Sequence, residues 1–209
     1  MNRRKFIYNS SIASLSVVGL NSCNILDENV KISILHTNDV HSQIEPFPSN
    51  HNIYADRGGF AKRANIFNGL MKLNPNTLIF DAGDIFQGTP YFNFFQGELE
   101  LNLMKKMGYN AATIGNHEFD AGLDILKRNI INNDFQFISS NYDFTNTALE
   151  GLVSRYKVFK KQNIRIGVFG LGIELKGLVN PKLYKETKYY DPIEISNEMT
   201  QKLKTEENC

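Results

Sequence analysis

Short apolar runs of strand length alternate along the chain with longer amphipathic segments of helix length. The clearest amphipathic segment is 59–72, where Phe60, Ala64 and Phe67 recur at helical spacing before Asn74-Pro75-Asn76 ends the pattern. This alternation is typical of a layered α/β domain. The pattern predicts further helices over 98–107, 123–131 and 191–204, strands over 30–35, 77–81, 111–114 and 135–139, and a hairpin of 156–159 with 164–169.

Two predicted helices carry recognisable end signals. Leu99, Leu103 and Met107 share one face of the helix over 98–107, and Gly108 is placed to cap its carboxyl end. Asp191-Pro192 fits the N-cap and first position of the last helix. We expect the stripes of Phe, Leu and Met to form the core rather than to contact a cofactor.

Nearly all of the acid, amide and imidazole chemistry gathers in three short segments, each of which follows a predicted strand. A pair of divalent ions needs a carboxylate that can bridge them and oxygen and nitrogen donors held by rigid backbone. The three segments supply donors of these kinds, and they predict half of a two-metal phosphoesterase site. They are Thr37-Asn38-Asp39-Val40-His41, Gly83-Asp84-Ile85-Phe86-Gln87-Gly88 and Gly115-Asn116-His117-Glu118-Phe119-Asp120.

Asp39 and His41 are two positions apart in the first segment. In an extended segment their side chains would project from the same face, so both could close on one ion. In the second segment, Gly83 lets the backbone turn tightly where the carboxylate of Asp84 must lie between the metals.

The third segment adds an amide and an imidazole. Asn116 offers a neutral carbonyl oxygen, which can bind a metal without adding negative charge to a site that awaits phosphate. His117 is adjacent, and we expect it to face the substrate.

Each segment also has an ordinary structural interpretation. Asp-x-His pairs are common in loops, where both side chains bond to nearby backbone, and Gly-Asp after a strand is commonly a turn. The tetrapeptide Gly115-Asn116-His117-Glu118 is more specific. The order of the three segments and their placement after strands favour the metal site.

The segments resemble the metallophosphoesterases, and within them the branch of 5'-nucleotidases and UDP-sugar hydrolases. The resemblance runs from about Val30 to the last residue, and it implies a layered β-sandwich flanked by helices. It also implies another strand beyond the last helix, so we expect this α/β domain to be incomplete at its C-terminus. The matching segments are Ile34–His41, Arg57–Ala61, Gly83-Asp84 with Phe86–Pro90, and Gly115–Asp120.

The resemblance implies a centre of two divalent metal ions. Asp39 and His41 would be terminal ligands of one ion, Asp84 the bridging carboxylate, and Asn116 a ligand of the second ion. Mixed oxygen and nitrogen ligands suit Zn²⁺, Mn²⁺, Fe or Co.

The resemblance also implies two catalytic residues. His117 would stabilise the phosphoryl transition state or protonate the leaving oxygen, and Asp120, three positions later, would orient the imidazole.

The family pattern includes three further histidines after a later strand, whereas this sequence contains only His36, His41, His51 and His117. His36 lies in an apolar run, so we expect a hydrogen-bonded core residue there. We expect His51 to lie in a solvated loop. Because neither replaces the missing ligands, we expect the 209-residue chain by itself to be inactive.

Residues 1–22 have the features of an export signal. Asn2-Arg3-Arg4-Lys5-Phe6-Ile7 precedes a moderately apolar stretch, 12–20, that is too short to span a membrane as a mature helix. The paired arginines resemble a twin-arginine signal. An ordinary secretory signal is the alternative.

Leu20-Asn21-Ser22-Cys23 resembles a lipoprotein cleavage site. Cys23 would then carry the lipid, residues 23–29 would form a tether, and 30–209 would be the amino-terminal part of a metallophosphoesterase domain. The alternative is that Cys23 is an incidental thiol. We expect an exported protein that is periplasmic or anchored to the membrane through Cys23.

Charge argues against a nucleic-acid surface. Removing residues 1–22 takes away three basic residues and no acid, which leaves 20 basic against 22 acidic residues. The expected partner is a small-molecule phosphate ester, a nucleotide foremost, which the protein would hydrolyse outside the cytoplasm.

Three other functions remain open. A cyclic phosphodiesterase, UDP-sugar hydrolase or thiosulfohydrolase would keep these motifs. A truncated, noncatalytic exported lipoprotein would bind metal or a partner without turnover. A purely structural cell-surface protein has no use for metal donors clustered after strands.

Overall fold

The computed structural model describes residues 29–209, and residues 32–209 form one compact unit. The predicted export signal, the lipid site at Cys23 and most of the predicted tether lie outside the described residues. Within the described part, no helix is both long and apolar enough to cross a bilayer.

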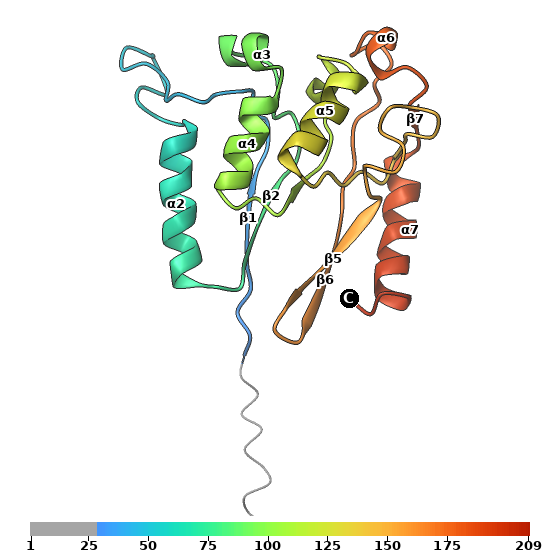
Figure 1. The fold of residues 1–209 in the computed structure, drawn as a ribbon. Helices are drawn as coiled ribbons and strands as arrows, with labels where there is room; N and C mark the ends of the chain where they lie inside the picture. Colours follow the sequence, from blue (N-terminus) through green and yellow to red (C-terminus); the bar gives the residue numbers. More distant parts are fainter. Residues whose placement is uncertain (1–28) are drawn as a thin grey trace, which may run out of the picture. The chain divides into compact units, whose positions relative to one another are not determined.

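A three-stranded parallel sheet forms the centre of this unit (Figure 1). Its order is β1 (Ser33–Thr37), β2 (Thr77–Asp81) and β3 (Ala111–Ala112). β1 pairs with β2 over its whole length, from Ser33 opposite Thr77 to Thr37 opposite Asp81. The strands are parallel, so their carboxyl ends meet at one edge of the sheet, the upper edge in Figure 1.

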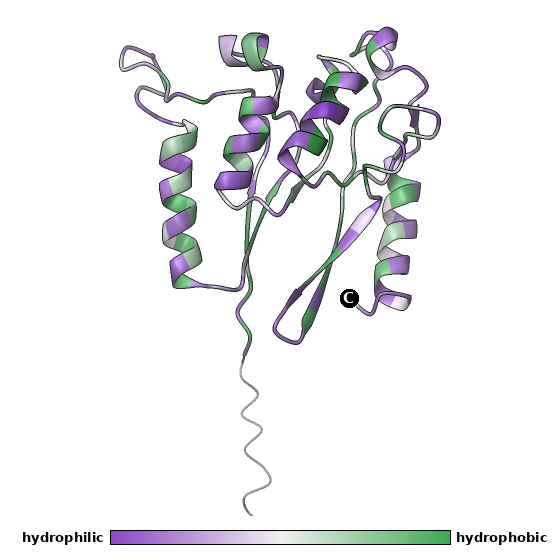
Figure 2. Ribbon diagram, in the orientation of Figure 1, coloured by the Kyte–Doolittle hydropathy of each residue, from purple (hydrophilic) through white to green (hydrophobic). Residues whose placement is uncertain are grey.

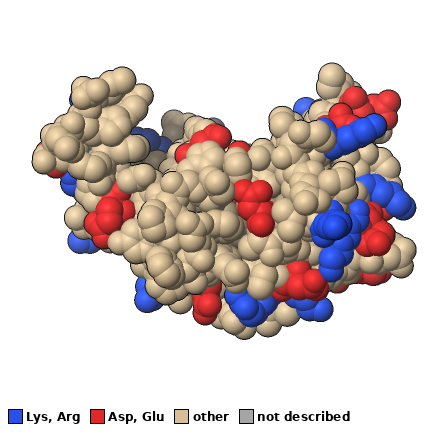
Figure 3. All heavy atoms as spheres, turned by 90° about the horizontal axis from the view of Figure 1, so that it is seen from above, with Lys and Arg blue, Asp and Glu red and all other residues tan. Residues whose placement is uncertain are grey.

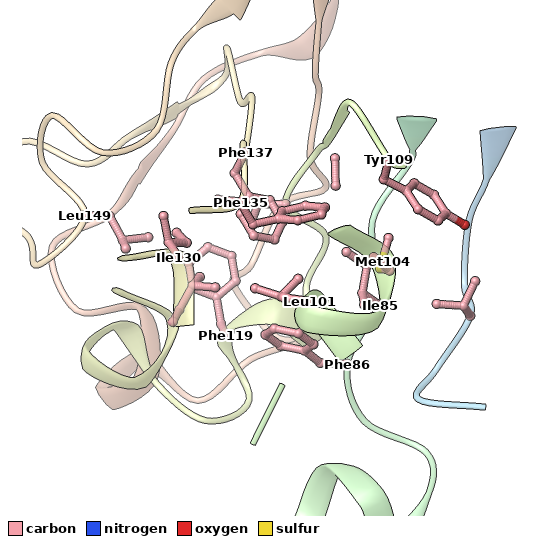
Figure 4. Close-up of a cluster of buried hydrophobic side chains, with 14 of the residues drawn as sticks. Ile85, Phe86, Leu101, Met104, Tyr109, Phe119, Ile130, Phe135, Phe137 and Leu149 are labelled. Atoms are coloured by element: carbon pink, nitrogen blue, oxygen red, sulfur yellow. The ribbon is translucent and has the colours of Figure 1, made fainter. Parts of the chain in front are cut away.

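Three helices connect or follow the strands: α2 (Phe60–Leu73), α4 (Glu98–Lys106) and α5 (Leu123–Asn133). Each carries both polar and apolar residues around its surface, as the mixture of purple and green in Figure 2 shows. Their apolar sides pack with one face of the sheet to form the core. In Figure 4, Ile85 lies beside Met104 and Phe86 beside Leu101.

The apolar face predicted for α4 is displaced. The structure buries Leu101, Met104 and the polar Glu100 fully, whereas Leu99 and Leu103 are only half-buried. Glu100 turns inward because its carboxylate accepts a hydrogen bond from the buried Ser42 hydroxyl. The helix therefore faces the core with a polar position that the apolar pattern alone does not identify.

A hairpin of β5 (Tyr156–Lys161) and β6 (Ile164–Phe169) covers the opposite face of the sheet. Phe159 contacts Phe80 of β2 with ring centroids 5.3 Å apart. The last helix, α7 (Pro192–Thr205), packs outside the hairpin, where Leu203 lies directly over Gly167. The result is the layered α/β arrangement that the sequence predicts.

The prediction for His36 is wrong, because this residue is exposed. Alternate residues of β1 face opposite sides of the sheet. Leu35 faces the helices and packs against the core, while Ile34 and His36 face the other side. There His36 borders a cavity of about 280 Å³ between the sheet and the hairpin.

The structure differs from the sequence prediction in one strand and in several short elements. Residues 135–139, predicted as a strand, make only isolated bridges, from Phe137 to Ala112 and from Ile138 to Ser154. The additional elements are α3 (Pro90–Phe95), η1 (His117–Phe119), β4 (Tyr142–Asp143), α6 (Pro181–Tyr184) and β7 (Lys188–Tyr189).

Candidate metal centre

Three turns meet at the carboxyl edge of the parallel sheet, one after each strand. The turn after β1 is joined to the turn after β2 by backbone hydrogen bonds. The Asp39 amide donates to the Gly83 carbonyl at 3.0 Å, and the His41 amide donates to the Asp84 carbonyl at 3.1 Å. The turns are therefore fixed relative to one another by backbone as well as by side chains.

The backbone of these turns is unusual for non-glycine residues. Asp39, His41 and Asp84 have φ values of 50°, 43° and 57°, in the left-handed region. Asp39 and His41 thus do not lie in an extended segment, and the predicted same-face geometry is wrong. The turn nevertheless brings them together, with Oδ1 of Asp39 3.8 Å from Nε2 of His41.

Two glycines allow the second and third turns to touch. A Cβ on Gly83 would lie 2.8 Å from the Gly115 backbone nitrogen, and a Cβ on Gly115 would lie 2.2 Å from Oδ1 of Asp84. Gly83 also has a φ of 97°. Any side chain at Gly115 would displace the Asp84 carboxylate.

His41, Asp84 and His117, one from each turn, form the centre of the site. Each offers one ligand atom, and these atoms all lie within 4.8 Å of one another. The two imidazole rings meet edge to face, with centroids 4.9 Å apart. The His41 imidazole and the Asp84 carboxylate, with the Asp39 carboxylate beside them, are a donor set that suits Zn²⁺, Mn²⁺, Fe or Co, so the residues present fit a divalent metal.

The remaining predicted ligands lie at the margin of this group. Asp39 contacts His41 but its side chain is 59% exposed. Asn116 lies half-buried between Gly115 and His117 in the third turn. His117 joins the cluster itself, although the sequence indicates a residue that faces substrate.

Asp120, which the resemblance implies would orient His117, contacts that imidazole. Its Oδ2 lies 2.7 Å from Nδ1 of His117, and Oδ1 of Asp84 accepts the backbone N–H of His117 at 3.1 Å. Partial burial opposes a charge on His117, but the hydrogen bond to Asp120 and the nearby carboxylates of Asp84 and Glu118 outweigh it and raise the pKa of the imidazole. The protonated ring is therefore favoured.

Glu118 is a site residue that the sequence did not reveal. Its side chain is fully buried and accepts backbone N–H groups from Asp84, Ile85, Phe86 and Gly115. Burial raises its pKa to about 7, against the opposing effect of these hydrogen bonds. The one sequence signal was its place in the tetrapeptide with Asn116 and His117.

A second buried carboxylate, Asp81, lies at the end of β2. It accepts hydrogen bonds from the Thr37 hydroxyl at 2.5 Å and from the Gly83 amide at 2.9 Å. The Thr37 hydroxyl also bonds to Tyr109 at 2.6 Å. Burial raises the pKa of Asp81 to about 6.

The remaining histidine, His51, lies in a loop, as predicted. Its Nδ1 accepts the backbone N–H of Tyr54 at 3.0 Å, and its ring packs against Phe47.

Figure 3 shows the molecule from above, the side of the sheet's carboxyl edge. Asp and Glu side chains lie near the middle of this face, and Lys and Arg gather towards one side.

Comparisons with known proteins agree with this geometry. The calcineurin-like phosphoesterase family matches residues 32–198. The chain is 32% identical to a snake venom 5'-nucleotidase from Gloydius brevicauda over 84% of its length, and 33% identical to the NAD 5'-nucleotidase of Haemophilus influenzae, also over 84%. It spans 31% and 30% of those proteins.

The solved structures include a 5'-nucleotidase precursor from Thermus thermophilus. It superposes with a TM-score of 0.76 at 31% sequence identity, over 84% of this chain and 35% of that protein. The fold, the matched region and the sequence identity agree, and the predicted resemblance is confirmed. The chain belongs to the calcineurin-like phosphoesterase family, the metallophosphoesterases.

Proposed function

We propose that this protein hydrolyses phosphate esters, foremost 5'-nucleotides, at a dinuclear metal centre outside the cytoplasm. The observation that carries the proposal is the convergence of His41, Asp84 and His117 from three separate turns within 4.8 Å. The relatives named 5'-nucleotidases support the substrate class. Since the chain spans about a third of their length, the activity of the whole protein belongs to the proposal.

The residues divide into those that hold metal and those that act on the ester. Asp84 would bridge two ions, Asp39 and His41 would hold one of them, and Asn116 would contribute to the other. Bound divalent ions would supply an activated water and neutralise phosphoryl charge.

His117 is the residue that we assign to proton transfer. Because Asp120 lies at Nδ1, the ring keeps Nε2 free to face a phosphoryl or leaving oxygen. Although partial burial opposes it, the hydrogen bond to Asp120 and the nearby carboxylates raise the pKa of the imidazole, which favours a ring that carries a proton at Nε2 for the leaving oxygen.

Counting donors gives a further part of the proposal. Asp39, His41 and Asp84 suffice for one ion, whereas Asp84 and Asn116 leave the second ion with few ligands. We therefore expect the 209-residue polypeptide to bind one ion well, the second poorly, and to show almost no phosphatase activity alone.

The activity is tested on the product of the gene that encodes this sequence. After metal is removed and restored, a nucleoside monophosphate, a UDP-sugar, a cyclic nucleotide and a thiosulfonate are compared as substrates. Fastest turnover of the monophosphate supports the proposal. Preference for another substrate favours the corresponding sister activity, and no turnover with metal bound favours the noncatalytic lipoprotein.

Variants separate the two groups of residues. His117→Ala should keep its metal and lose turnover by about 10²- to 10⁴-fold, the contribution typical of a positioned acid. Asp84→Ala should lose both metal and turnover. A His117→Ala protein with full turnover would refute the assignment of this histidine.

Export and lipid attachment form a separate part of the proposal, carried by residues 1–22 and Cys23. Cys23→Ser should release the protein from the membrane fraction if this residue carries a lipid. Arg3→Lys combined with Arg4→Lys tests the twin-arginine route independently. Membrane fractionation that Cys23→Ser leaves unchanged would identify an incidental thiol.

A further inference from the structure

We propose that Glu118 is a positioning residue that clamps the turn after β2 to the turn after β3, and so sets the distance between Asp84 and the Asn116-His117 pair. This inference rests on the proposed function for its purpose. The clamp itself is a property of the fold that can be tested without any metal.

The two carboxylate oxygens have distinct tasks. Oε2 accepts the Asp84 amide at 3.0 Å and the Gly115 amide at 2.6 Å, so one atom joins both turns. Oε1 accepts the Ile85 amide at 2.6 Å and the Phe86 amide at 3.3 Å. These amides belong to neither helix nor strand, and buried backbone donors need an acceptor.

The clamp also supports a strained residue. Asp84 has a φ of 57°, a conformation that non-glycine residues adopt only when their surroundings hold them there. The bond from its amide to Glu118 stabilises this conformation on one side. The backbone N–H of His117, which donates to Oδ1 of Asp84 at 3.1 Å, supports its side chain on the other.

Glutamine cannot replace this carboxylate. Its amide has one acceptor oxygen, and its NH₂ group would face backbone N–H donors. In Glu118→Gln, an NH₂ group must therefore replace either the oxygen that accepts the Asp84 and Gly115 amides or the oxygen that accepts the Ile85 and Phe86 amides. In the first case the two ligand turns lose their common anchor, and in the second the turn after β2 loses the acceptor of its Ile85 and Phe86 amides.

The test compares Mn²⁺ affinity by calorimetry in the metal-free 209-residue polypeptide and its Glu118→Gln variant. We expect Glu118→Gln to bind Mn²⁺ about 10- to 100-fold more weakly while circular dichroism still shows a folded protein. The control is Asp143→Asn, which alters a carboxylate that accepts the Thr145 amide outside the three turns. It should bind Mn²⁺ as tightly as the unchanged chain. A folded Glu118→Gln with unchanged affinity would overturn the proposal.

A second measurement decides the question if the variant does not fold or if the unchanged chain binds no Mn²⁺. Hydrogen exchange on the unchanged, metal-free chain should show slow exchange at Asp84, Ile85 and Gly115, although they lie in turns. Exchange as fast as that of exposed loop amides would overturn the clamp. Absence of Mn²⁺ binding with slow exchange at these amides would instead refute the metal binding proposed for this polypeptide and leave the clamp supported.

Discussion

At the scale of single residues, the site depends on positions that cannot accept another side chain. Gly115 is the sharpest case, because its backbone lies against the Asp84 carboxylate. The tetrapeptide that contains it was recognisable in the sequence. The reason for its glycine was not, because the partner lies in another turn far away along the chain.

Replacing Gly115 with alanine should abolish metal binding. The new Cβ would lie 2.2 Å from Oδ1 of Asp84, so the carboxylate must move. Gly69→Ala is the matched control, because it adds a Cβ that meets no atom within 4 Å in helix α2 and alanine favours a helix by about 1 kcal/mol. Mn²⁺ affinity measured by calorimetry checks both variants. Equal affinity in Gly115→Ala and Gly69→Ala would contradict the packing described.

Asp81 predicts a pH dependence of stability with a definite sign. Burial raises its pKa to about 6 in the folded chain from 3.8, so the folded state binds more protons than the unfolded state between these values. The contribution of Asp81 to the free energy of unfolding is therefore complete below about pH 4, and it decreases by about 3 kcal/mol as the pH rises through 6.

Urea unfolding of the metal-free polypeptide between pH 4 and 7 measures this effect. Asp81→Asn should reduce the loss of unfolding free energy with rising pH. Asp143→Asn should leave the slope in this range unchanged, because the Asp143 carboxyl bonds to Thr145 and has its pKa lowered to about 2. A slope in Asp81→Asn identical to that of the unchanged chain would show that Asp81 does not titrate in this range.

Glu118 and His36 show where sequence reasoning at this scale fails. Nothing in the chain distinguishes a glutamate that accepts four backbone amides from one in solvent, since most of its donors come from another stretch of sequence. The error for His36 has the opposite origin. An apolar run indicates a strand, but not which of its two faces is covered.

At the scale of elements, local signals predicted most of the structure. β2, the hairpin strand β6 and the start of α7 match their expected positions. The short elements were missed because a few residues show no measurable period. Residues 135–139 have a composition typical of a strand, but they do not form a continuous one. Phe137 and Ile138 each make one isolated bridge, and each bridge is to a different segment.

The N-cap of α7 gives a prediction at this scale. The Asp191 carboxylate accepts the amides of Ile193 at 2.8 Å and Glu194 at 3.0 Å. Asp191→Ala should lower the free energy of unfolding by about 0.5–2 kcal/mol, whereas Asp191→Asn should retain most of it because asparagine caps helices equally well. Urea denaturation compares them. Equal losses in both variants would mean that charge, not capping, stabilises this helix end.

At the scale of the whole molecule, the site exists because three parallel strands end at the same edge. Their order in the sheet and the hydrogen bonds between turns could not be derived from local pattern. The resemblance to metallophosphoesterases implied the layered fold and a common metal site, and the family, the fold and the convergence of His41, Asp84 and His117 agree with it.

The most direct test of the central claim is metal content. Purified 209-residue polypeptide is equilibrated with Mn²⁺ or Zn²⁺, freed of excess, and analysed by mass spectrometry beside Asp84→Ala and Asp56→Ala, the latter altering an exposed loop carboxylate. We predict close to one ion per chain in the unchanged protein and in Asp56→Ala, and none in Asp84→Ala. Equal metal content in all three proteins would contradict the assignment of this edge of the sheet as a metal centre.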